Sequence, residues 1–137
     1  MSGENLDRLC ARYGYQIATE VYAAMNKTAS ATENHITKSL GVLQEDGLYA
    51  FALYQASRGR EKNGSQTLAD IAKNLLGEVG IPPFDACPSP DLLEGLRGDS
   101  KNKFKGLTES LDALLLAKRL LEQTLIYARY HAKALEP

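Results

Sequence analysis

The apolar residues of this chain recur every three or four positions and do not alternate one by one. The spacing is clearest between Asn5 and Met25, and a leucine-rich stretch runs from Leu107 towards Ala134. Three to four residues is the period of an amphipathic α-helix, whereas the residues of a half-buried strand alternate. The sequence therefore predicts an all-α protein, a compact bundle of about five to six helices with a long C-terminal helix.

Caps and turns divide the segment between these two helices. Ser30 and Glu33 have the spacing of a capping box, in which each side chain satisfies a free backbone N–H at the start of a helix. They predict the start of a second helix, and Gly47 ends it, because glycine takes the left-handed conformation of a C-terminal cap. A third helix is expected over residues 48–57, LYAFALYQAS.

Loops follow this helix wherever glycine, proline and charge accumulate. Residues 58–65, RGREKNGS, hold two glycines and four charged residues and predict an exposed loop. A fourth, leucine-rich helix ends at Gly80, and three prolines over 82–88 exclude a continuous helix there. Ser89, placed before a proline, predicts the cap of a short helix that ends near Leu96.

Length and composition fit one soluble domain. With 137 residues, 44% of them hydrophobic, the chain is expected to form a single helical domain over residues 1–137. Neither a basic, apolar leader nor a run of about 20 apolar residues is present, so we expect a cytoplasmic protein without a membrane segment. A reducing cytoplasm would keep Cys10 and Cys87 as thiols.

Residues for catalysis or metal binding are scarce. The soft metal ligands are His35, His131, Cys10 and Cys87, and no two of them have the spacing of a metal site. Nucleophile-elbow and phosphate-loop motifs are absent as well. We therefore expect no metal, no cofactor and no enzymatic activity. A DNA-binding helix-turn-helix is disfavoured, because residues 48–57 carry apolar groups on nearly every face.

Charge is distributed unevenly along the chain. The net charge is −1, but residues 1–57 carry −2 and residues 101–137 carry +3. A helical period of about 100° per residue places the charged residues of the last helix within one arc. The arc holds Lys118, Arg119, Arg129, Lys133, Asp112 and Glu122, while Leu114, Leu116, Leu120, Leu121 and Leu125 lie mostly outside it.

Such a basic arc is a candidate RNA-binding surface. Ion pairing and counterion release would let it follow a phosphate backbone, but a solvated helix face with pairs such as Lys118 and Glu122 has the same sequence. The same two interpretations hold for two further groups of bases. These groups are Arg58, Arg60 and Lys62 in the predicted loop, and Lys103 and Lys105 beside Phe104.

The order of these segments matches a known pattern. A first helix is followed by ITKSLGVLQEDGLYAFALYQAS, a basic glycine-containing loop, a leucine helix and FKGLTESLDALLLAKRLLEQTLIYA. The turn at Gly47 opens an apolar helix, and the last helix has Thr-Glu at 108–109 and a basic pair at 118–119. In this order the chain resembles the small subunit of the type III-B CRISPR effector, the Cmr complex. That family often has a proline before the turn and an aromatic residue before the basic pair, and this chain has neither.

The resemblance implies a non-catalytic subunit, present in several copies stacked head to tail beside the guide RNA and target RNA in antiviral defence. Its partners would be the other effector subunits, neighbouring copies of itself and both RNAs, with cleavage left to neighbouring subunits. The basic residues would then line the RNA channel. Two alternatives remain open: a small subunit of a related type III-A or type I complex, and a helical adaptor that binds only protein through the apolar surface of the third helix.

Overall fold

The all-α prediction is confirmed by the structure, a computed structural model that describes residues 5–57, 62–87, 89–98 and 106–135. Six α-helices and one short 3-10 helix, with no β-strand, make up these residues. They are α1 (Leu6–Ala24), α2 (Ala29–Asp46), α3 (Leu48–Ala56), α4 (Lys62–Val79), α5 (Leu92–Arg97), the 3-10 helix η1 (Leu107–Glu109) and α6 (Leu111–Lys133). The last helix, α6, is the longest at 23 residues.

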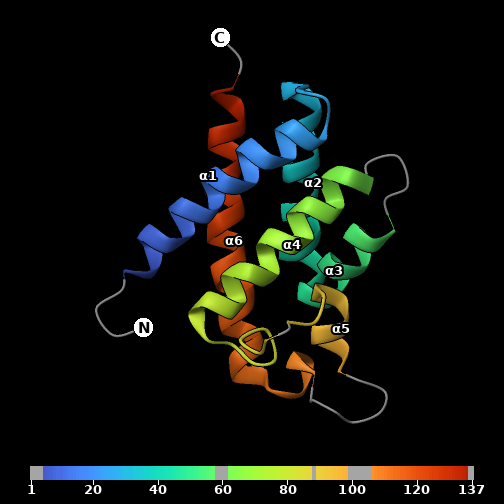
Figure 1. The fold of residues 1–137 in the computed structure, drawn as a ribbon, viewed down its shortest axis with the longest axis vertical. Helices are drawn as coiled ribbons and strands as arrows, with labels where there is room; N and C mark the ends of the chain where they lie inside the picture. Colours follow the sequence, from blue (N-terminus) through green and yellow to red (C-terminus); the bar gives the residue numbers. More distant parts are fainter. Residues whose placement is uncertain (1–4, 58–61, 88, 99–105, 136–137) are drawn as a thin grey trace.

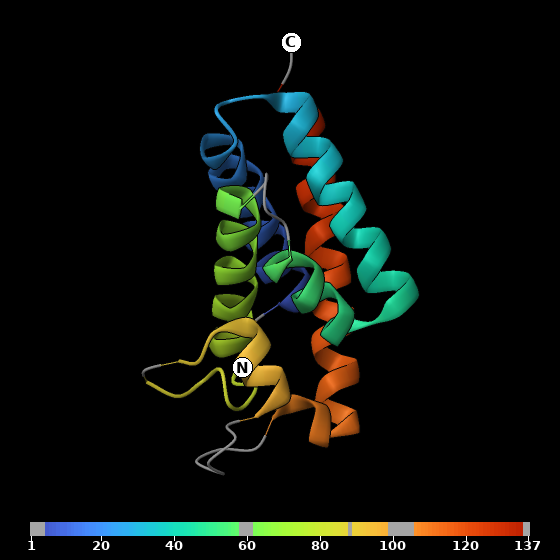
Figure 2. The same cartoon turned by 90° about the vertical axis from the view of Figure 1, so that its right-hand side faces the viewer.

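The helices form two crossed layers. In one layer α1 and α4 lie side by side, and in the other α2 packs along α6 (Figures 1 and 2). The shorter helices α3 and α5 lie toward the end of the bundle that is lower in both views. Although α1 and α2 both pack on α6, exposed or partly exposed residues recur along this helix from Leu111 to Lys133.

The two layers approach most closely where α1 crosses α6. A β-carbon at Gly14 would lie 2.8 Å from the carbonyl oxygen of Thr124 and 2.8 Å from the β-carbon of Tyr127. These distances are shorter than van der Waals contact, so only glycine lets the helices come this close. Nearby, the thiol of Cys10 donates a hydrogen bond to the carbonyl oxygen of Leu120 at 3.5 Å. The crossing therefore fixes which side of α6 is buried.

One hydrophobic core joins both layers. Buried side chains from every α-helix contact one another in a continuous cluster. Its most completely buried members include Ile17, Ile36, Leu43, Phe51, Leu75, Leu96, Leu121 and Leu125. Burial of this apolar surface is the main favourable contribution to folding, since each such side chain contributes about 1.5–3 kcal/mol.

The predicted capping box at the start of α2 is wrong. Ser30 lies inside the first turn, and Thr28 occupies the cap position, where its side chain accepts no hydrogen bond from a free amide. The turn before it decides this start, because Asn26 and Lys27 both have positive φ, +58° and +55°, and turn the chain sharply after α1. Glu33 is thereby released from capping and reaches α6 instead.

Gly47 separates α2 from α3 as the sequence predicts. Its φ of +96° favours glycine, although its ψ of 179° is extended rather than left-handed helical. Its N–H donates to the carbonyl oxygen of Leu43 at 3.1 Å and closes the last turn of α2. On α3 the buried residues are Leu48, Phe51, Ala52 and Gln55. This helix therefore turns one side to the core rather than presenting it to a DNA groove.

The predicted loop over residues 58–65 is partly wrong, because its second half forms the first turn of α4. Ser65 is 1% exposed, and its hydroxyl lies 3.2 Å from Nε2 of the buried His35 on α2. A β-carbon at Gly64 would lie 2.9 Å from the sulfur of Met25, so this glycine serves close packing and not a turn. Tertiary contacts override the local Asn-Gly turn signal here.

The cap of α5 is Asp91 and not Ser89. The carboxylate of Asp91 accepts a hydrogen bond from the backbone N–H of Glu94 at 2.8 Å. Aspartate is a strong capping residue because its short side chain reaches this amide without strain. The helix itself, Leu92–Arg97, lies where the sequence predicts it.

The long C-terminal helix begins at Leu111 and not at Leu107. Ser110 is extended, with φ −121° and ψ 104°, and interrupts the helix after η1. The hydroxyl of Thr108 holds η1 against α5 by donating to the carbonyl oxygen of Leu96 at 2.8 Å. This contact between distant segments decides where α6 starts, and the local sequence does not reveal it.

Candidate interaction surface

The bases of the predicted arc lie on the outer face of α6, and two of them are close to carboxylates that offset their charge. Nζ of Lys118 lies 3.8 Å from Oε1 of Glu122, and Nζ of Lys133 lies 3.9 Å from Oε2 of Glu33 on α2. Such solvent-exposed pairs contribute little to stability. Each of them nevertheless places a carboxylate beside a cation that is predicted to contact phosphate. The arc is therefore less basic than its sequence indicates.

The two arginines of the arc have different surroundings. Arg129 is half-buried, its Nε is inaccessible to solvent, and its guanidinium carbon lies 5.6 Å from the centre of the Tyr130 ring. Arg119 is exposed on the side of α6 that faces α1. Within the described part of the chain it forms no ion pair. Of the four bases, Arg119 is thus the one that is exposed and has no ion-pair partner among the described residues.

The remaining predicted RNA contacts have no described side chains. Arg58, Arg60, Lys103 and Lys105 lie outside the described residues. Lys62 is the first residue of α4, and its side chain is not described. The predicted RNA surface is consequently assessed on α6 alone.

Three leucines on the outer face of α6 are exposed to solvent. Leu111 is 67% exposed, Leu115 55% and Leu116 41%. Leu116, which the helical period places outside the charged arc, is also exposed, because the N-terminal third of α6 extends past the last turn of α2 (Figures 1 and 2). Leu111 and Leu115 stand seven and three residues before Lys118, so the helical period itself places them on the polar arc. Their position on the polar arc could therefore have predicted from the sequence that these two leucines are exposed.

A hollow of about 380 Å³ lies beside these leucines, between α6 and the N-terminal half of α1. Its lining residues are Leu6, Asp7, Cys10, Leu116, Arg119, Leu120 and Gln123. Burial raises the pKa of the Cys10 thiol, so this group is protonated and forms part of an apolar wall. We call the three exposed leucines together with this hollow the α6 patch.

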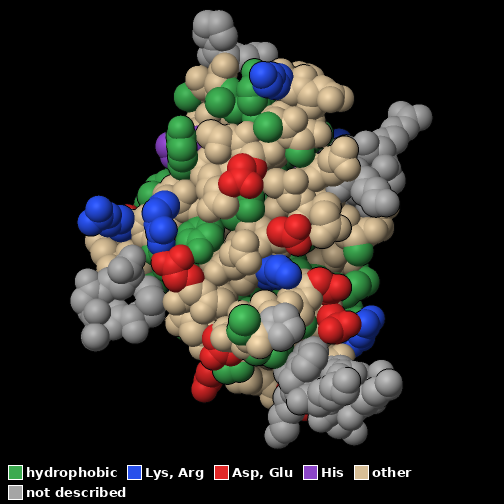
Figure 3. All heavy atoms as spheres, in the orientation of Figure 1, with side chains coloured by type: hydrophobic (Ala, Val, Ile, Leu, Met, Phe, Trp, Pro, Cys, Tyr) green, Lys and Arg blue, Asp and Glu red, His purple; other side chains and the backbone are tan. Residues whose placement is uncertain are grey.

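Exposed apolar or aromatic side chains also occur outside the α6 patch. Figure 3 shows that basic and acidic side chains are interspersed over the face formed by α1 and α4. On this side Tyr15 is 59% exposed and meets the ring of His131 edge to face at 5.3 Å between ring centres. On α3, Leu53 is 46% exposed. This leucine is the apolar surface that the adaptor hypothesis requires.

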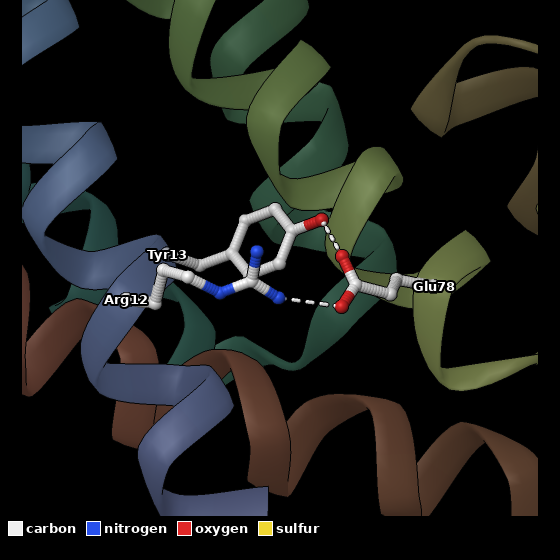
Figure 4. A network of polar contacts seen from close by, with 3 residues as sticks. All are labelled: Arg12, Tyr13 and Glu78. Carbon is white, nitrogen blue, oxygen red and sulfur yellow. Dashed lines mark hydrogen bonds and ion pairs between the residues drawn. The ribbon is translucent and has the colours of Figure 1, made fainter. Parts of the chain in front are cut away.

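A polar network of Arg12, Tyr13 and Glu78 ties α1 to α4 (Figure 4). The hydroxyl of Tyr13 donates to Oε1 of Glu78 at 2.6 Å, and Nη2 of Arg12 donates to Oε2 at 2.5 Å. The hydrogen bond from Tyr13 and the charge of Arg12 lower the pKa of Glu78. Burial and the hydrogen bond to Glu78 raise the pKa of Tyr13 to about 12. At neutral pH Tyr13 is therefore neutral and Glu78 ionised, which is the pair of charge states in which this hydrogen bond joins α1 to α4.

Replacing Tyr13 by phenylalanine is expected to lower the free energy of unfolding by about 1 kcal/mol at pH 7, because a hydrogen bond to a charged group is lost at a partly exposed site. The pKa of Glu78 is lower in the folded than in the unfolded chain. Its contribution to stability is therefore present above the ordinary carboxyl pKa and is lost as the pH falls through the folded value. The difference between wild type and Tyr13→Phe should shrink when urea unfolding is repeated below about pH 4.

Tyr15→Phe is the matched control, since Tyr15 stands on the same helix but is mostly exposed. It should change the free energy of unfolding by less than about 0.5 kcal/mol. An effect of Tyr13→Phe that equals the control, or that does not change with pH, would contradict the role given to this network.

Clusters that could hold a metal ion do not form in the part of the chain that the structure describes. No group of three or more His, Cys, Asp or Glu side chains among these residues is placed to hold a metal ion. His35 packs in the core against Ser65, and His131 packs against Tyr15. Across the described ranges, no helix combines the length and the apolar content needed to cross a bilayer. Comparison with protein families, curated proteins and solved structures gives no match for this chain.

Proposed function

We propose that the protein is a non-catalytic small subunit of an RNA-guided effector complex of the type III-B CRISPR (Cmr) kind. The observation that carries this proposal is the α6 patch, where Leu111, Leu115 and Leu116 are exposed beside the basic arc. Contiguous exposed apolar side chains on a folded domain mark interaction sites. The order of helices, which resembles the Cmr small subunit, supports the choice of complex.

A subunit that docks beside RNA needs two kinds of contact, and the outer face of α6 offers groups for both. Leucines give apolar area to a protein partner, and bases give countercharge to a phosphate backbone. Because Lys118 and Lys133 each lie near a carboxylate, the described residues of one copy offer few free bases to phosphate. Weak contacts add up when several copies line one strand. Neighbouring copies, the other effector subunits and both RNAs are thus the proposed partners, and cleavage belongs to the other effector subunits.

Purification of the tagged full-length protein from its native host tests the proposal. We expect mass spectrometry to identify other effector subunits, and sequencing to identify guide RNA in the same fractions. The yield of target RNA should fall as the salt concentration rises, because phosphate contacts release counterions. Recovery of ribosomal background alone would contradict the proposal. Recovery of type III-A or type I subunits would assign the protein to one of those complexes instead.

A second candidate function is a helical adaptor that binds only protein through α3. It is favoured by one observation, the 46% exposure of Leu53 on this helix. In the same purification the adaptor predicts stable protein partners and no retained RNA. The identity of the required surface also separates the two functions, because the adaptor uses Leu53 and the small subunit uses the α6 patch.

A further inference from the structure

We propose that the hollow between α3, α4 and α5 binds a small aliphatic diamine in its protonated form. These three helices pack against one another (Figures 1 and 2), and the hollow where they meet has a volume of about 190 Å³. This volume is below the roughly 300–1,000 Å³ of pockets for drug-sized molecules, so the hollow suits a small ligand. The inference uses no residue of the α6 patch and does not depend on the proposed function.

The charged residues around this hollow are mostly acidic. Three of the lining residues are acids, Asp70 of α4 and Asp91 and Glu94 at the start of α5. Arg97 is the one base among the described lining residues, so their charge balance is −2. None of these four forms an ion pair within the described ranges, and the hydrogen bonds that the two aspartates accept come from neutral amides. The lining therefore attracts a cation and repels a phosphate or carboxylate.

Gln55 of α3 adds a buried acceptor that has no partner. It lines the hollow and is 5% exposed, and its Nε2 donates a hydrogen bond to the hydroxyl oxygen of Ser39 at 2.8 Å. Its Oε1 is inaccessible to solvent and accepts no hydrogen bond from any described residue. A buried acceptor without a donor costs free energy, which a donor on a ligand would offset. An ammonium group has three N–H donors and no acceptor, so it meets this requirement.

The hydroxyl of Ser65 is a second acceptor in the lining. Ser65 is 1% exposed, and its Oγ lies 3.2 Å from Nε2 of the buried His35. A hydroxyl has one donor and two lone pairs, so at least one lone pair stays available whichever of the two groups donates. The buried part of the lining thus offers oxygen acceptors from both α3 and α4.

The remaining lining is largely apolar and small. It consists of Ala52, Ala56 and Ala69 from α3 and α4, and of Leu92 and Leu93 from α5. Methylene groups pack favourably on such walls. A metal ion would need a cluster of ligands, and the described residues contain no group of three or more His, Cys, Asp or Glu placed to hold one. Two ammonium groups on a short methylene chain therefore match the charge balance, the acceptors and the apolar walls together.

Titration of the purified full-length protein with diaminobutane, followed by amide chemical shifts in NMR spectra, tests the inference. We expect saturable shifts that are confined to the residues of α3, α4 and α5 around the hollow. Butylamine has one ammonium group and should bind about threefold or more weakly, and butanediol has none and should not bind. Magnesium chloride should not displace the diamine at equal ionic strength, because magnesium keeps its water ligands and makes no apolar contacts.

Two substitutions locate the site. Glu94→Gln should weaken the binding of diaminobutane about threefold or more, because an exposed carboxylate is lost. Glu45→Gln makes the same chemical change at an exposed position of α2 and should leave binding unchanged. Gln55→Leu should weaken binding at least about tenfold, because it removes the acceptor of a charged donor. Both glutamate variants should unfold like wild type, since Glu94 and Glu45 are exposed.

Absence of saturable binding, binding of butanediol as tight as that of the diamine, or displacement by magnesium would overturn the inference. Equal binding by wild type and Glu94→Gln, or shifts that lie outside the three helices, would do the same. No component of an effector complex enters the titration, so its result and that of the purification from the host are independent.

Discussion

Replacing Leu121 by alanine is expected to lower the free energy of unfolding by about 2–5 kcal/mol, the range for truncation of a fully buried leucine. Leu121 is 0% exposed and stands on the side of α6 that packs into the core shared by both layers. The truncation removes apolar contacts and leaves a cavity, because the surrounding helices close only in part. Urea unfolding followed by circular dichroism measures the change.

Leu115→Ala is the control for this prediction, since it makes the same chemical change six residues earlier in the same helix. Leu115 is 55% exposed, so its truncation should change stability by less than about 0.5 kcal/mol. Equal losses in the two variants would contradict the orientation of α6, and with it the assignment of an outer face.

Gly14→Ala is expected to lower the free energy of unfolding by about 1–3 kcal/mol, although alanine is the better helix former. The new β-carbon would lie 2.8 Å from the backbone oxygen of Thr124 and 2.8 Å from the β-carbon of Tyr127. Neither atom belongs to the flexible end of a side chain, so α1 must move away from α6. The thermal midpoint and the urea midpoint should both decrease.

Gly41→Ala is the same chemical change but is expected to have the opposite effect on stability. Gly41 lies within α2, and a β-carbon there would meet no atom within 4 Å. The change should raise the free energy of unfolding by about 0.5–1 kcal/mol, because alanine loses less backbone entropy in a helix. A destabilised Gly41→Ala together with an unchanged Gly14→Ala would refute the close crossing of α1 and α6.

Most of the fold follows from local sequence signals. The three-to-four spacing of apolar residues predicts α1 almost to its ends, and Gly47 correctly marks the boundary between α2 and α3. These features depend on the helical period and on the φ angle of glycine, which a short segment determines by itself.

The helix starts that the sequence does not predict depend on contacts between distant segments. The first turn of α4 is held by Ser65 against His35, thirty positions earlier in the chain. The start of α6 depends on Thr108, whose hydroxyl bonds to the carbonyl oxygen of Leu96. A Gly-rich or polar stretch is predicted to be a loop when only the residues adjacent in sequence are considered. Hydrogen bonds to distant residues can nevertheless hold it in a helix.

The candidate surface could be predicted only in part. The period of α6 gathers Lys118, Arg119, Arg129 and Lys133 on one side of the helix, as the structure also places them. The period does not reveal that Glu33 of α2 lies beside Lys133, because that proximity depends on how α2 packs. Nor does it reveal the hollow beside α1, since a hollow needs two helices to form. Helical position therefore predicts a face, and packing decides which of its charges remain available.

Comparative purification of two variants tests the central claim, that the outer face of α6 docks this subunit into its complex. Leu115→Glu places a charge in the α6 patch, and Leu53→Glu places the same charge on the exposed side of α3. Quantitative mass spectrometry after expression in the native host should show effector subunits lost with Leu115→Glu and retained with Leu53→Glu, while both variants unfold like wild type. Retention with Leu115→Glu and loss with Leu53→Glu would contradict the account.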